Sequence, residues 1–445
     1  MPSQSDVVSR CESDDIRLVR LLYVGNDGVV RGHVVDGNRI AHSFEHGENL
    51  ATVVQSLTAT DVVAPTGEFG ATGEVRLRPD STTFRPLPYA DRTAAMLCDL
   101  STLDGEPWVA DPRSTLGEYS DSLAKRGLTA RLGFESEFYL LVDDGTDAGP
   151  RPVDDSPCYA AEGMQTVDDV ILATLEALDD QGIPVGAYHP ELGPGQQEFV
   201  QDHAAGLAAV DDHLFLRRTV QAVARAHGLD ASFAPKPLPD AAGNGCHVHL
   251  SLWADGRNVF FDAERDSPYG LSETGRYFVG GLLEHAPGLV ALTAASPASY
   301  RRLQPSSWAS AYTCWGADNR EAVVRVPSAD RGRREASTRV EFKPSDHTAN
   351  PYLAVVGILA AGMDGIDGEI DPGRPLDVDP ATLGESELRA RGIERLPESL
   401  DAALDALAAD EVLTAALGET LVESYIAVKR ARCETSGSGT GAPSV

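Results

Sequence analysis

The sequence is poor in lysine and contains no long apolar run. Only four of its 37 basic residues are lysines, whereas 68 residues are acidic, so the 445-residue chain carries a formal net charge of −31. A chain this acidic is expected to repel nucleic acid and anionic membranes, which excludes both as partners. No apolar run reaches about 18 residues, so no transmembrane helix is expected. The opening stretch MPSQSDVVSRCESDD is polar and is not expected to be a secretory signal, so we expect a cytoplasmic protein.

Closely spaced cysteines and the common short catalytic motifs are also absent. The six cysteines stand singly, with no C-x-x-C, so we expect free thiols and no structural zinc site. The patterns G-x-x-x-x-G-K-[ST], G-x-G-x-x-G, G-x-S-x-G and H-E-x-x-H do not occur either. Their absence argues against P-loop enzymes, dinucleotide-binding folds, hydrolases with a nucleophile elbow and zinc proteases of the H-E-x-x-H type.

The acidic residues are spread along the whole chain and are not gathered in a tail. This distribution predicts a protein adapted to high salt, where screening relieves the repulsion between carboxylates. The alternative is an ordinary acidic cytosolic protein. Unfolding at low ionic strength would support the first interpretation.

The length favours two domains. Residues 16–35 predict two strands around a turn at 25–28, and further strands are expected at 74–78 and 93–99, so we expect a β-rich domain over 14–108. A larger domain is expected over 109–432, followed by a disordered tail over 433–445. Helices are predicted at 114–126 with Ser114 as N-cap, at 166–182 with Thr166 as N-cap, at 205–227, 349–365 and 397–430. Strands are predicted at 133–140, 244–253 and 320–326. Because strands and helices do not alternate regularly after residue 130, the fold class is expected to be α+β.

Several acidic and histidine residues lie in apolar or glycine-rich segments. In GFESEFYL, Glu135 and Glu137 are expected on one face of a strand, where their like charges would raise each other's pKa unless something offsets the repulsion. The other members of this set lie in three further segments: Glu191 and Glu198 in HPELGPGQQEF, His247 and His249 with Ser251 in NGCHVHLSLW, and Glu341 in RVEFK. Carboxylates with a histidine are ligands that suit Mg²⁺ or Mn²⁺, and paired ions would remove the repulsion.

Arginines form a second group, in the segments RRLQP, NREAVVRVP and RVEFK. Guanidinium groups bind phosphate and carboxylate, and arginines with divalent ions but no obvious nucleophile are typical of phosphoryl transfer. Each pattern alone is more often structural: a carboxylate pair on a strand is usually solvated, and H-x-H is usually not a ligand pair. Their joint occurrence is what indicates a site.

The ordered segments GFESEFYL, ELGPGQQEF, APKP, NGCHVHLSLW, SYRRL, NREAVVRVP and RVEFKPSDHTANPYLA strongly resemble the glutamine synthetase family. The resemblance runs from about residue 15 to 430. It implies a small N-terminal β-grasp domain and a large catalytic domain with a curved antiparallel sheet. It also implies homo-oligomeric rings with active sites between subunits, and a reaction in which ATP phosphorylates glutamate before an amine attacks.

The resemblance assigns a role to each matched position. Glu137, Glu191 and Glu198 match the ligands of the metal nearer the amine, and Glu135, His247 and Glu341 match those of the metal that holds the ATP phosphates. The nucleotide contacts match His249, Ser251 and Arg339; the phosphoryl-stabilising arginines match Arg320 and Arg325; the glutamate contacts match Arg302 and Gly243. Two to three Mg²⁺ or Mn²⁺ ions per site are implied, and Glu191 is expected to contribute to catalysis.

The chain departs from the family pattern on the amine and amino-acid side. Trp308 stands where glutamine-forming members carry a glutamate that helps deprotonate ammonium, and it could instead wall a longer amine or offer a cation–π face. Ala242 replaces an asparagine that helps to hold the amino acid. Lys343 replaces an arginine whose guanidinium group makes a bidentate contact with the glutamate carboxylate. Tyr159 keeps an aromatic place near the pocket, while Asp61 is a weak counterpart for an aspartate that a neighbouring subunit supplies.

Three interpretations follow from these departures. The first is a ligase that joins glutamate to an amine other than ammonia, like the γ-glutamyl-polyamine, -ethanolamine or -alkylamide synthetases. The second is an ordinary glutamine synthetase with a divergent loop. The third is an inactive homologue that acts as a sensor or scaffold. The intact set of metal ligands argues against the third.

Overall fold

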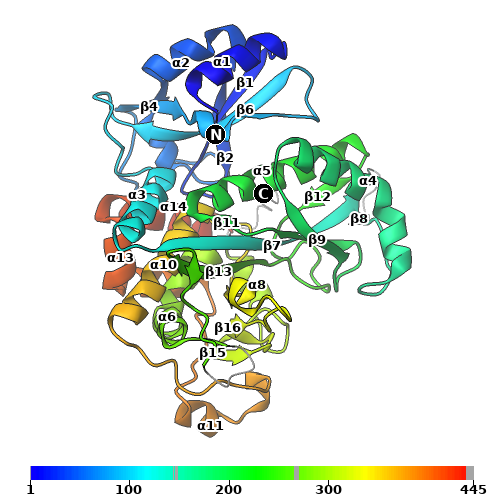
Figure 1. Cartoon of the computed structure of the whole chain (residues 1–445), viewed down its shortest axis with the longest axis vertical. Helices are drawn as coiled ribbons and strands as arrows, with labels where there is room; N and C mark the ends of the chain where they lie inside the picture. The colour runs from blue at the N-terminus through cyan, green and yellow to red at the C-terminus, as the bar shows by residue number, and fades with distance from the viewer. Residues whose placement is uncertain (1, 144, 146–148, 265–269, 437–445) are drawn as a thin grey trace.

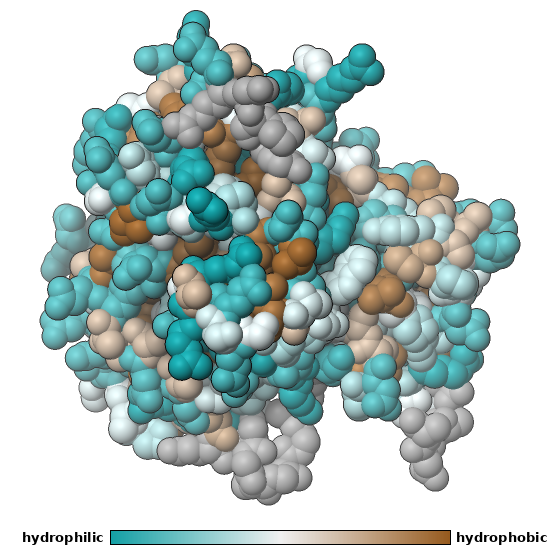
Figure 2. Space-filling model, turned by 90° about the horizontal axis from the view of Figure 1, so that it is seen from below, coloured by the Kyte–Doolittle hydropathy of each residue, from teal (hydrophilic) through white to brown (hydrophobic). Residues whose placement is uncertain are grey.

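The computed structural model describes residues 2–143, 145, 149–264 and 270–436. Within these residues one sheet is formed by the N-terminal part and a second, larger sheet by the part that follows (Figure 1). No helix of the described chain is long and apolar enough to cross a membrane. The face in Figure 2 is mostly hydrophilic, with scattered hydrophobic side chains, as the high net charge predicts.

The N-terminal sheet has the strand order β2-β1-β6-β4-β3, with β5 beside β6. Its strands are β1 Leu18–Val24, β2 Val30–Asp36, β3 Glu48–Ala51, β4 Glu74–Pro79, β5 Arg85–Pro86 and β6 Thr93–Ser101. The predicted turn is confirmed: the Gly28 N–H donates to the Gly25 carbonyl at 2.9 Å, and Gly28 has a φ of +89°. A Cβ there would lie 2.8 Å from the Thr348 carbonyl oxygen, so this turn, which lies against the segment after β17, requires glycine.

The larger sheet has the order β15-β16-β17-β13-β7-β10-β9, with four short strands paired to β7 or β13. Its strands are β7 Thr129–Val142, β8 Arg151–Pro152, β9 Val185–Pro190, β10 Gln196–Gln201, β11 Ala204–Ala205, β12 Asp230–Ser232, β13 Cys246–Ala254, β14 Arg257–Asn258, β15 Tyr312–Ala317, β16 Ala322–Val326 and β17 Val340–Phe342. Its pairs are antiparallel, as predicted, except for β15 and β16, which pair in parallel at the edge with a break in register after Tyr312.

The two faces of β7 differ as its alternation requires. Phe134 and Phe138 are buried in the core, and helix α5 Gly206–Ala226 packs against β7. Glu135 and Glu137 lie on the opposite face, so the predicted arrangement of GFESEFYL is confirmed. In Figure 1, β7 spans the middle of the molecule, with α5 above it and β13 below.

The starts of three helices differ from the sequence predictions. Helix α1 Gln4–Ser13 was not predicted; it begins at a capping box formed by Ser3 and Asp6. Helix α3 Pro112–Lys125 begins earlier than expected because Asp111, not Ser114, is its N-cap. Helix α4 Ala161–Asp180 also begins earlier, and Thr166 does not cap it: its hydroxyl donates to the Glu162 carbonyl inside the helix.

The C-terminal helical region is divided into three helices. It comprises α12 Leu400–Ala409, α13 Glu411–Leu417 and α14 Glu419–Ser436. Asp410 accepts from the first N–H groups of α13, and Gly418, with a φ of +83°, ends that helix. The predicted disordered tail begins at residue 433, which still belongs to α14; residues 437–445 lie outside the described chain. The remaining helices are α2 Ile40–His46, α6 Glu273–Glu284, α7 Ala286–Thr293, α8 Ser299–Arg302, α9 Arg334–Ser337, α10 Pro351–Asp367 and α11 Glu385–Ala390.

Candidate active site

Strand β7 positions the first two acidic residues, and its neighbours supply the next two polar groups. In the register of β7 with β10, Glu137 lies opposite Glu198. In the register of β7 with β13, Glu135 lies opposite His247. Antiparallel pairing brings directly opposed side chains to within about 5 Å at Cβ, so residues from three separate sequence segments meet on one face of the sheet.

Strand β17 adds a buried carboxylate beside the histidines. Glu341 is 0% exposed and lies opposite His249 on one side and Arg325 on the other. Its Oε2 accepts a hydrogen bond from Arg325 at 2.9 Å, and its Oε1 lies 3.6 Å from the Lys343 ammonium. The predicted cluster of RVEFK with the H-x-H segment is thus brought together by strand pairing.

One group of candidate metal ligands forms around Glu135 and Glu341. One ligand atom from each of Glu135, His249 and Glu341 lies within 4.8 Å of the others. His249 Nε2 is 2.9 Å from a Glu135 oxygen, while His247 Nδ1 is 3.3 Å from both Glu135 Oε2 and Glu341 Oε1. Both histidines therefore reach this group, including His249, which was predicted to contact the nucleotide.

A second group forms around the β9–β10 turn and contains a residue that the sequence analysis missed. One ligand atom from each of His189, Glu191 and Glu198 lies within 4.8 Å of the others. His189 lies between the carboxylates, 3.6 Å from Glu191 and 3.4 Å from Glu198. The signal was present in HPELGPGQQEF, because His189 and Glu191 alternate at the end of a strand in the manner of Glu135 and Glu137.

Neighbouring charges divide the carboxylates into two electrostatic classes. Burial alone would raise the pKa of Glu341, but Lys343 and His249 outweigh it and lower this pKa to about 2. Glu135 behaves alike: burial opposes ionisation, yet His249 and His247 hold its pKa well below the usual value. Burial instead raises the pKa of Glu198 to about 8, and burial with the Glu137 charge raises that of Glu191. Histidines thus offset the repulsion predicted at Glu135.

Hydrogen bonds fix Glu137, which lies opposite Glu198, beside the second group. Its Oε2 accepts from the Gly245 N–H at 2.8 Å and from Gln196 Nε2 at 3.2 Å. A Cβ at Gly245 would lie 2.6 Å from His247 Nε2, and one at Gly243 would lie 2.6 Å from the Pro235 carbonyl oxygen. These glycines therefore allow this backbone segment to approach His247, Arg302 and the Pro235 carbonyl closely.

Two cavities meet at Glu135. The first has a volume of about 430 Å³, and its lining includes Glu135, Glu137, Glu191, Glu198, His247, Tyr159, Gly243, Arg302, Trp308, Arg320, Arg325 and Lys343. The second has a volume of about 470 Å³, and its lining includes Glu135, His249, Ser251 and Arg339. The structure thus brings the predicted site residues to two adjoining cavities, with Glu341 buried beneath them. A larger cavity of about 890 Å³ beside Trp315 is lined by none of the predicted site residues.

The loop that carries Trp308 has a strained backbone. Ser306, Trp308 and Ser310 all have positive φ values, 53°, 61° and 68°, where residues other than glycine are uncommon. The Trp308 N–H donates to Glu321 Oε1 at 2.6 Å, and the Trp308 residue is 59% exposed at the rim of the first cavity. Asp61 lines neither cavity and instead pairs with Arg31 at 2.7 Å.

The donor sets fit divalent cations. Glu341 Oε1 is buried and has no hydrogen-bond partner among the described residues. Nitrogen atoms of His247, His249 and Lys343 nevertheless lie within 4 Å of it. Carboxylate oxygens with imidazole nitrogens suit Mg²⁺ and Mn²⁺. An ion in either group would replace the carboxylate–histidine contacts that hold these side chains together.

Comparison with known proteins agrees with this geometry. The family model for the glutamine synthetase N-terminal domain matches residues 2–108, and that for the glutamine synthetase catalytic domain matches residues 109–439. A gamma-glutamylpolyamine synthetase of Streptomyces coelicolor is 36% identical over 413 residues, covering 92% of this chain and 88% of its own length. A glutamine synthetase of Methanocaldococcus jannaschii is 38% identical over 365 residues, covering 80% and 79%.

Solved structures extend the similarity to nearly the whole chain. A GmaS complex with ADP superposes with a TM-score of 0.86 at 32% identity, covering 98% of this chain and 97% of its own. A glutamine synthase homologue gives a TM-score of 0.84 at 32% identity, covering 96% of each chain. Members of the matched family use ATP and divalent metal ions. The chain therefore belongs to the glutamine synthetase family of ATP-dependent glutamate ligases.

Proposed function

We propose that this enzyme joins the γ-carboxylate of glutamate to an amine other than, or in addition to, ammonia. The observation that carries the proposal is the lining of the 430 Å³ cavity. Trp308 and Tyr159, both more than half exposed, line this cavity together with the carboxylates of Glu137, Glu191 and Glu198. Aromatic faces and an apolar rim suit the carbon chain of an organic amine, and the carboxylates suit its cationic nitrogen.

Two chemical steps account for the arrangement of charges. The γ-carboxylate of glutamate attacks the terminal phosphorus of ATP, giving γ-glutamyl phosphate and ADP. The amine then attacks the acyl carbon, phosphate leaves, and one proton of the amine passes to a base. Arg320 and Arg325 neutralise charge on the transferring phosphoryl group, and Arg302, Gly243 and Lys343 hold glutamate. Burial and the Glu137 charge raise the pKa of Glu191, which suits a group beside the attacking nitrogen.

We further propose that each active site binds two to three Mg²⁺ or Mn²⁺ ions. Glu135, His247 and Glu341 would hold the ion nearer the phosphates, and Glu137, Glu191 and Glu198 would hold the ion nearer the amine. His249 and His189 belong to the same two clusters of potential ligands. Such ions supply Lewis-acid polarisation of phosphoryl oxygens when bound. His249, Ser251 and Arg339, which line the 470 Å³ cavity, bind the nucleotide.

Phosphate release from ATP tests the proposal. The enzyme is assayed in molar salt with glutamate and Mg²⁺ or Mn²⁺, with ammonium, methylamine, ethanolamine and putrescine in parallel, and the products are identified by mass. Turnover with an organic amine well above that with ammonium supports the proposal. Turnover chiefly with ammonium would make the enzyme an ordinary glutamine synthetase, and no turnover with any amine would favour an inactive homologue.

The second candidate function, glutamate–ammonia ligation, is equally compatible with the sequence identities. Glutamine synthetases of several archaea and of Thermotoga maritima are 31–38% identical to this chain, a range that includes the value for the polyamine enzyme. Identity alone therefore does not separate the two functions. The amine side of the cavity is what distinguishes them.

We further propose that the protein is cytoplasmic, is adapted to high salt and forms a homo-oligomeric ring. Each subunit is proposed to consist of two domains that meet at about residue 108. The proposal that a neighbouring subunit covers one cavity rim is supported by the exposed apolar side chains there, Trp308, Tyr159 and Leu192. The proposal of salt adaptation is supported by the net charge of −31. Sedimentation in molar salt, followed by stepwise dilution of the salt, tests both. A monomer in molar salt, or full stability at low ionic strength, would contradict the corresponding part.

A further inference from the structure

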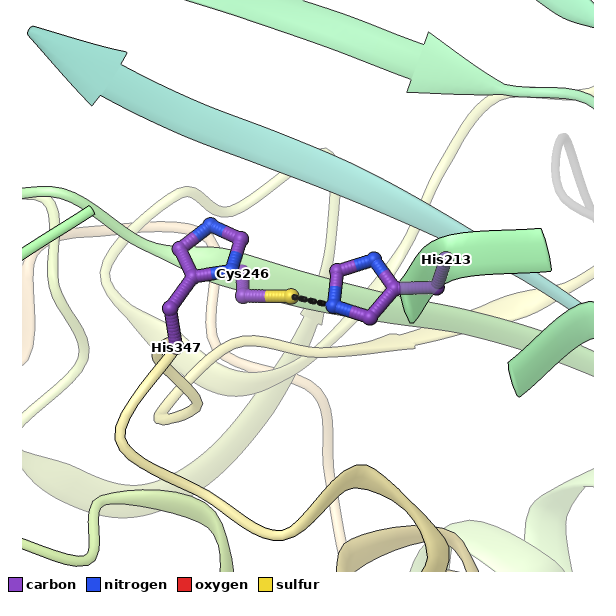
Figure 3. Close-up of side chains that lie close together, drawn as sticks. All are labelled: His213, Cys246 and His347. Carbon is purple, nitrogen blue, oxygen red and sulfur yellow. Dashed lines mark hydrogen bonds between the residues drawn. The ribbon is translucent and has the colours of Figure 1, made fainter. Parts of the chain in front are cut away.

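Three buried residues that the proposed reaction does not use lie on the reverse face of the catalytic strands. Cys246 directly precedes His247 on β13 and lies opposite Ser136 of β7. Because successive side chains point to opposite faces of a strand, Cys246 points away from the cavities, as Ser136 does between Glu135 and Glu137. Figure 3 shows His213 from a helix and His347 from a loop on either side of Cys246.

The three side chains are arranged as a set of nitrogen and sulfur donors. One ligand atom from each of His213, Cys246 and His347 lies within 4.8 Å of the others. Cys246 Sγ is 3.8 Å from His213 Nε2, and the two imidazole rings stack with centroids 5.5 Å apart. Helix α5, strand β13 and the segment after β17 each supply one residue, so the set joins three elements.

Hydrogen bonding within the described residues accounts for His213 better than for His347. His347 is 3% exposed, and neither of its ring nitrogens makes a hydrogen bond of ordinary geometry to a described residue, although the Glu137 backbone acts on the ring. His213 is 1% exposed, and its Nδ1 is 3.4 Å from the Ser136 hydroxyl, at the limit of a hydrogen bond. Burying a polar group without a partner is unfavourable, so a ligand for His347 would remove that penalty.

Aromatic packing explains the ring faces but not the ring nitrogens. His213 stacks on Phe134 at 4.4 Å, and His347 meets the edge of Phe233 at 4.6 Å. A phenylalanine or leucine would fill the same space without an unpaired nitrogen. Two histidines and a cysteine that converge from three elements are instead the side chains that a metal ion would require.

We propose that His213, Cys246 and His347 bind one thiophilic metal ion, Cu⁺ or Zn²⁺, behind the catalytic sheet. Thiolate and imidazole are ligands for both ions, and oxygen-preferring Mg²⁺ is not expected to compete. On binding, the Cys246 thiol releases its proton to solvent and the thiolate bonds to the ion. Burial and the nearby Arg217 guanidinium lower the pKa of both His213 and His347, so this site disfavours added positive charge. A neutral Cu⁺–thiolate pair is therefore expected to bind more tightly than Zn²⁺–thiolate, which keeps a positive charge.

Metal content under Mg²⁺ competition tests the site. The full-length protein is dialysed in excess Mg²⁺ against Zn²⁺, or anaerobically against Cu⁺, and bound metal is counted by elemental analysis. About one equivalent per chain is expected, with one sulfur ligand at about 2.3 Å in X-ray absorption for Zn²⁺. Cu⁺ binding alone, or Zn²⁺ binding alone, identifies the ion. Binding of neither ion, or Zn²⁺ bound only by nitrogen and oxygen, overturns the proposal.

Matched variants locate the bound ion. Cys246→Ser and His347→Phe should each weaken binding by at least about 100-fold, because a ligand matters more than an outer-shell partner. His347→Phe keeps a ring against Phe233, so it separates ligand loss from packing loss. Cys314→Ser is the control, because Cys314 is also 4% exposed but lies outside this set. Equal metal content in wild type, Cys246→Ser and His347→Phe would contradict the assignment.

Discussion

The residues of the candidate active site are held in two different ways. Glu135, His247 and Glu341 stand on paired strands, where register fixes which side chains are opposed. Trp308 and Tyr159 stand on loops, with φ values of 61° and 60°, and are 59% and 56% exposed. In many enzymes the catalytic residues lie on a rigid scaffold, and the residues that select the substrate lie on loops. The comparison predicts that changes in the two sets affect different kinetic parameters.

The largest effect is expected from the buried carboxylate of the sheet-held set. Glu341→Gln keeps the shape of the side chain but removes the charge that faces Arg325 and Lys343. Phosphate release should fall on the order of 10³-fold with every amine, because an electrostatic element of the site is lost. Circular dichroism and a thermal melt check that the variant folds. Activity within about tenfold of wild type would contradict the proposed role of Glu341.

A change on the nucleotide side should alter mainly ATP binding. Arg339 Nε donates to His249 Nδ1 at 3.1 Å at the wall of the 470 Å³ cavity. Arg339→Ala should raise KM for ATP by about 10- to 100-fold, the value of one charge-assisted hydrogen bond, with a smaller effect on KM for the amine. Initial rates with ATP and amine varied separately measure both. An equal rise in both KM values would contradict the proposal that the two cavities bind ATP and the amine separately.

A change in the loop-held set should alter amine choice alone. Trp308→Glu places a carboxylate at the cavity rim and removes an aromatic wall. The ratio of kcat/KM for ammonium to that for an organic amine should rise by about tenfold, with KM for ATP unchanged. Trp308→Phe is the matched control and should keep the organic-amine preference. An unchanged ratio in a folded, ATP-binding Trp308→Glu variant would remove Trp308 from substrate selection.

The smallest catalytic effect is expected far from both sets, at a histidine that joins three helices. His285 Nδ1 is 2.8 Å from Asp410 and its Nε2 is 3.1 Å from Asp364. Burial opposes its protonation, but these carboxylates outweigh burial and raise the pKa of His285 above 6.5. The stabilisation is therefore fully present below pH 6.5 and is lost as the pH rises through the folded-state pKa.

His285→Gln should accordingly lower the free energy of unfolding by about 2 kcal/mol in weakly acidic solution and by less in alkaline solution. Denaturant unfolding of both proteins across this range measures the difference. Both KM values should stay unchanged. A destabilisation that is independent of pH would mean that packing, not charge, is the contribution of His285.

Local chemistry made much of this structure predictable. The alternation in GFESEFYL placed Glu135 and Glu137 correctly on one face, and the glycines at 25–28 located the first turn. Helix starts were less predictable because several side chains can cap: Asp111 competes with Ser114, and Thr166 bonds inside its helix. Pro112, a residue typical of the first helical position, was the better signal.

Contacts between distant segments could not be predicted in the same way. The sequence shows neither that His189 lies between Glu191 and Glu198 nor that His213 reaches Cys246, because strand register and helix packing decide both. The absence of C-x-x-C led us to expect no structural zinc site, yet a donor set can be assembled from single residues far apart in the chain.

The alternation of β7 and β13 has a consequence for how this sequence can change in length. Loss or gain of a single residue within either strand would turn every following side chain to the other face. A change at the start of β13 would then turn His247 and His249 toward the core and Val248 toward the cavities, so one such event would disrupt both faces at once. Insertions and deletions are therefore expected to be excluded from these two strands, while the loop around Trp308 remains free to vary in length.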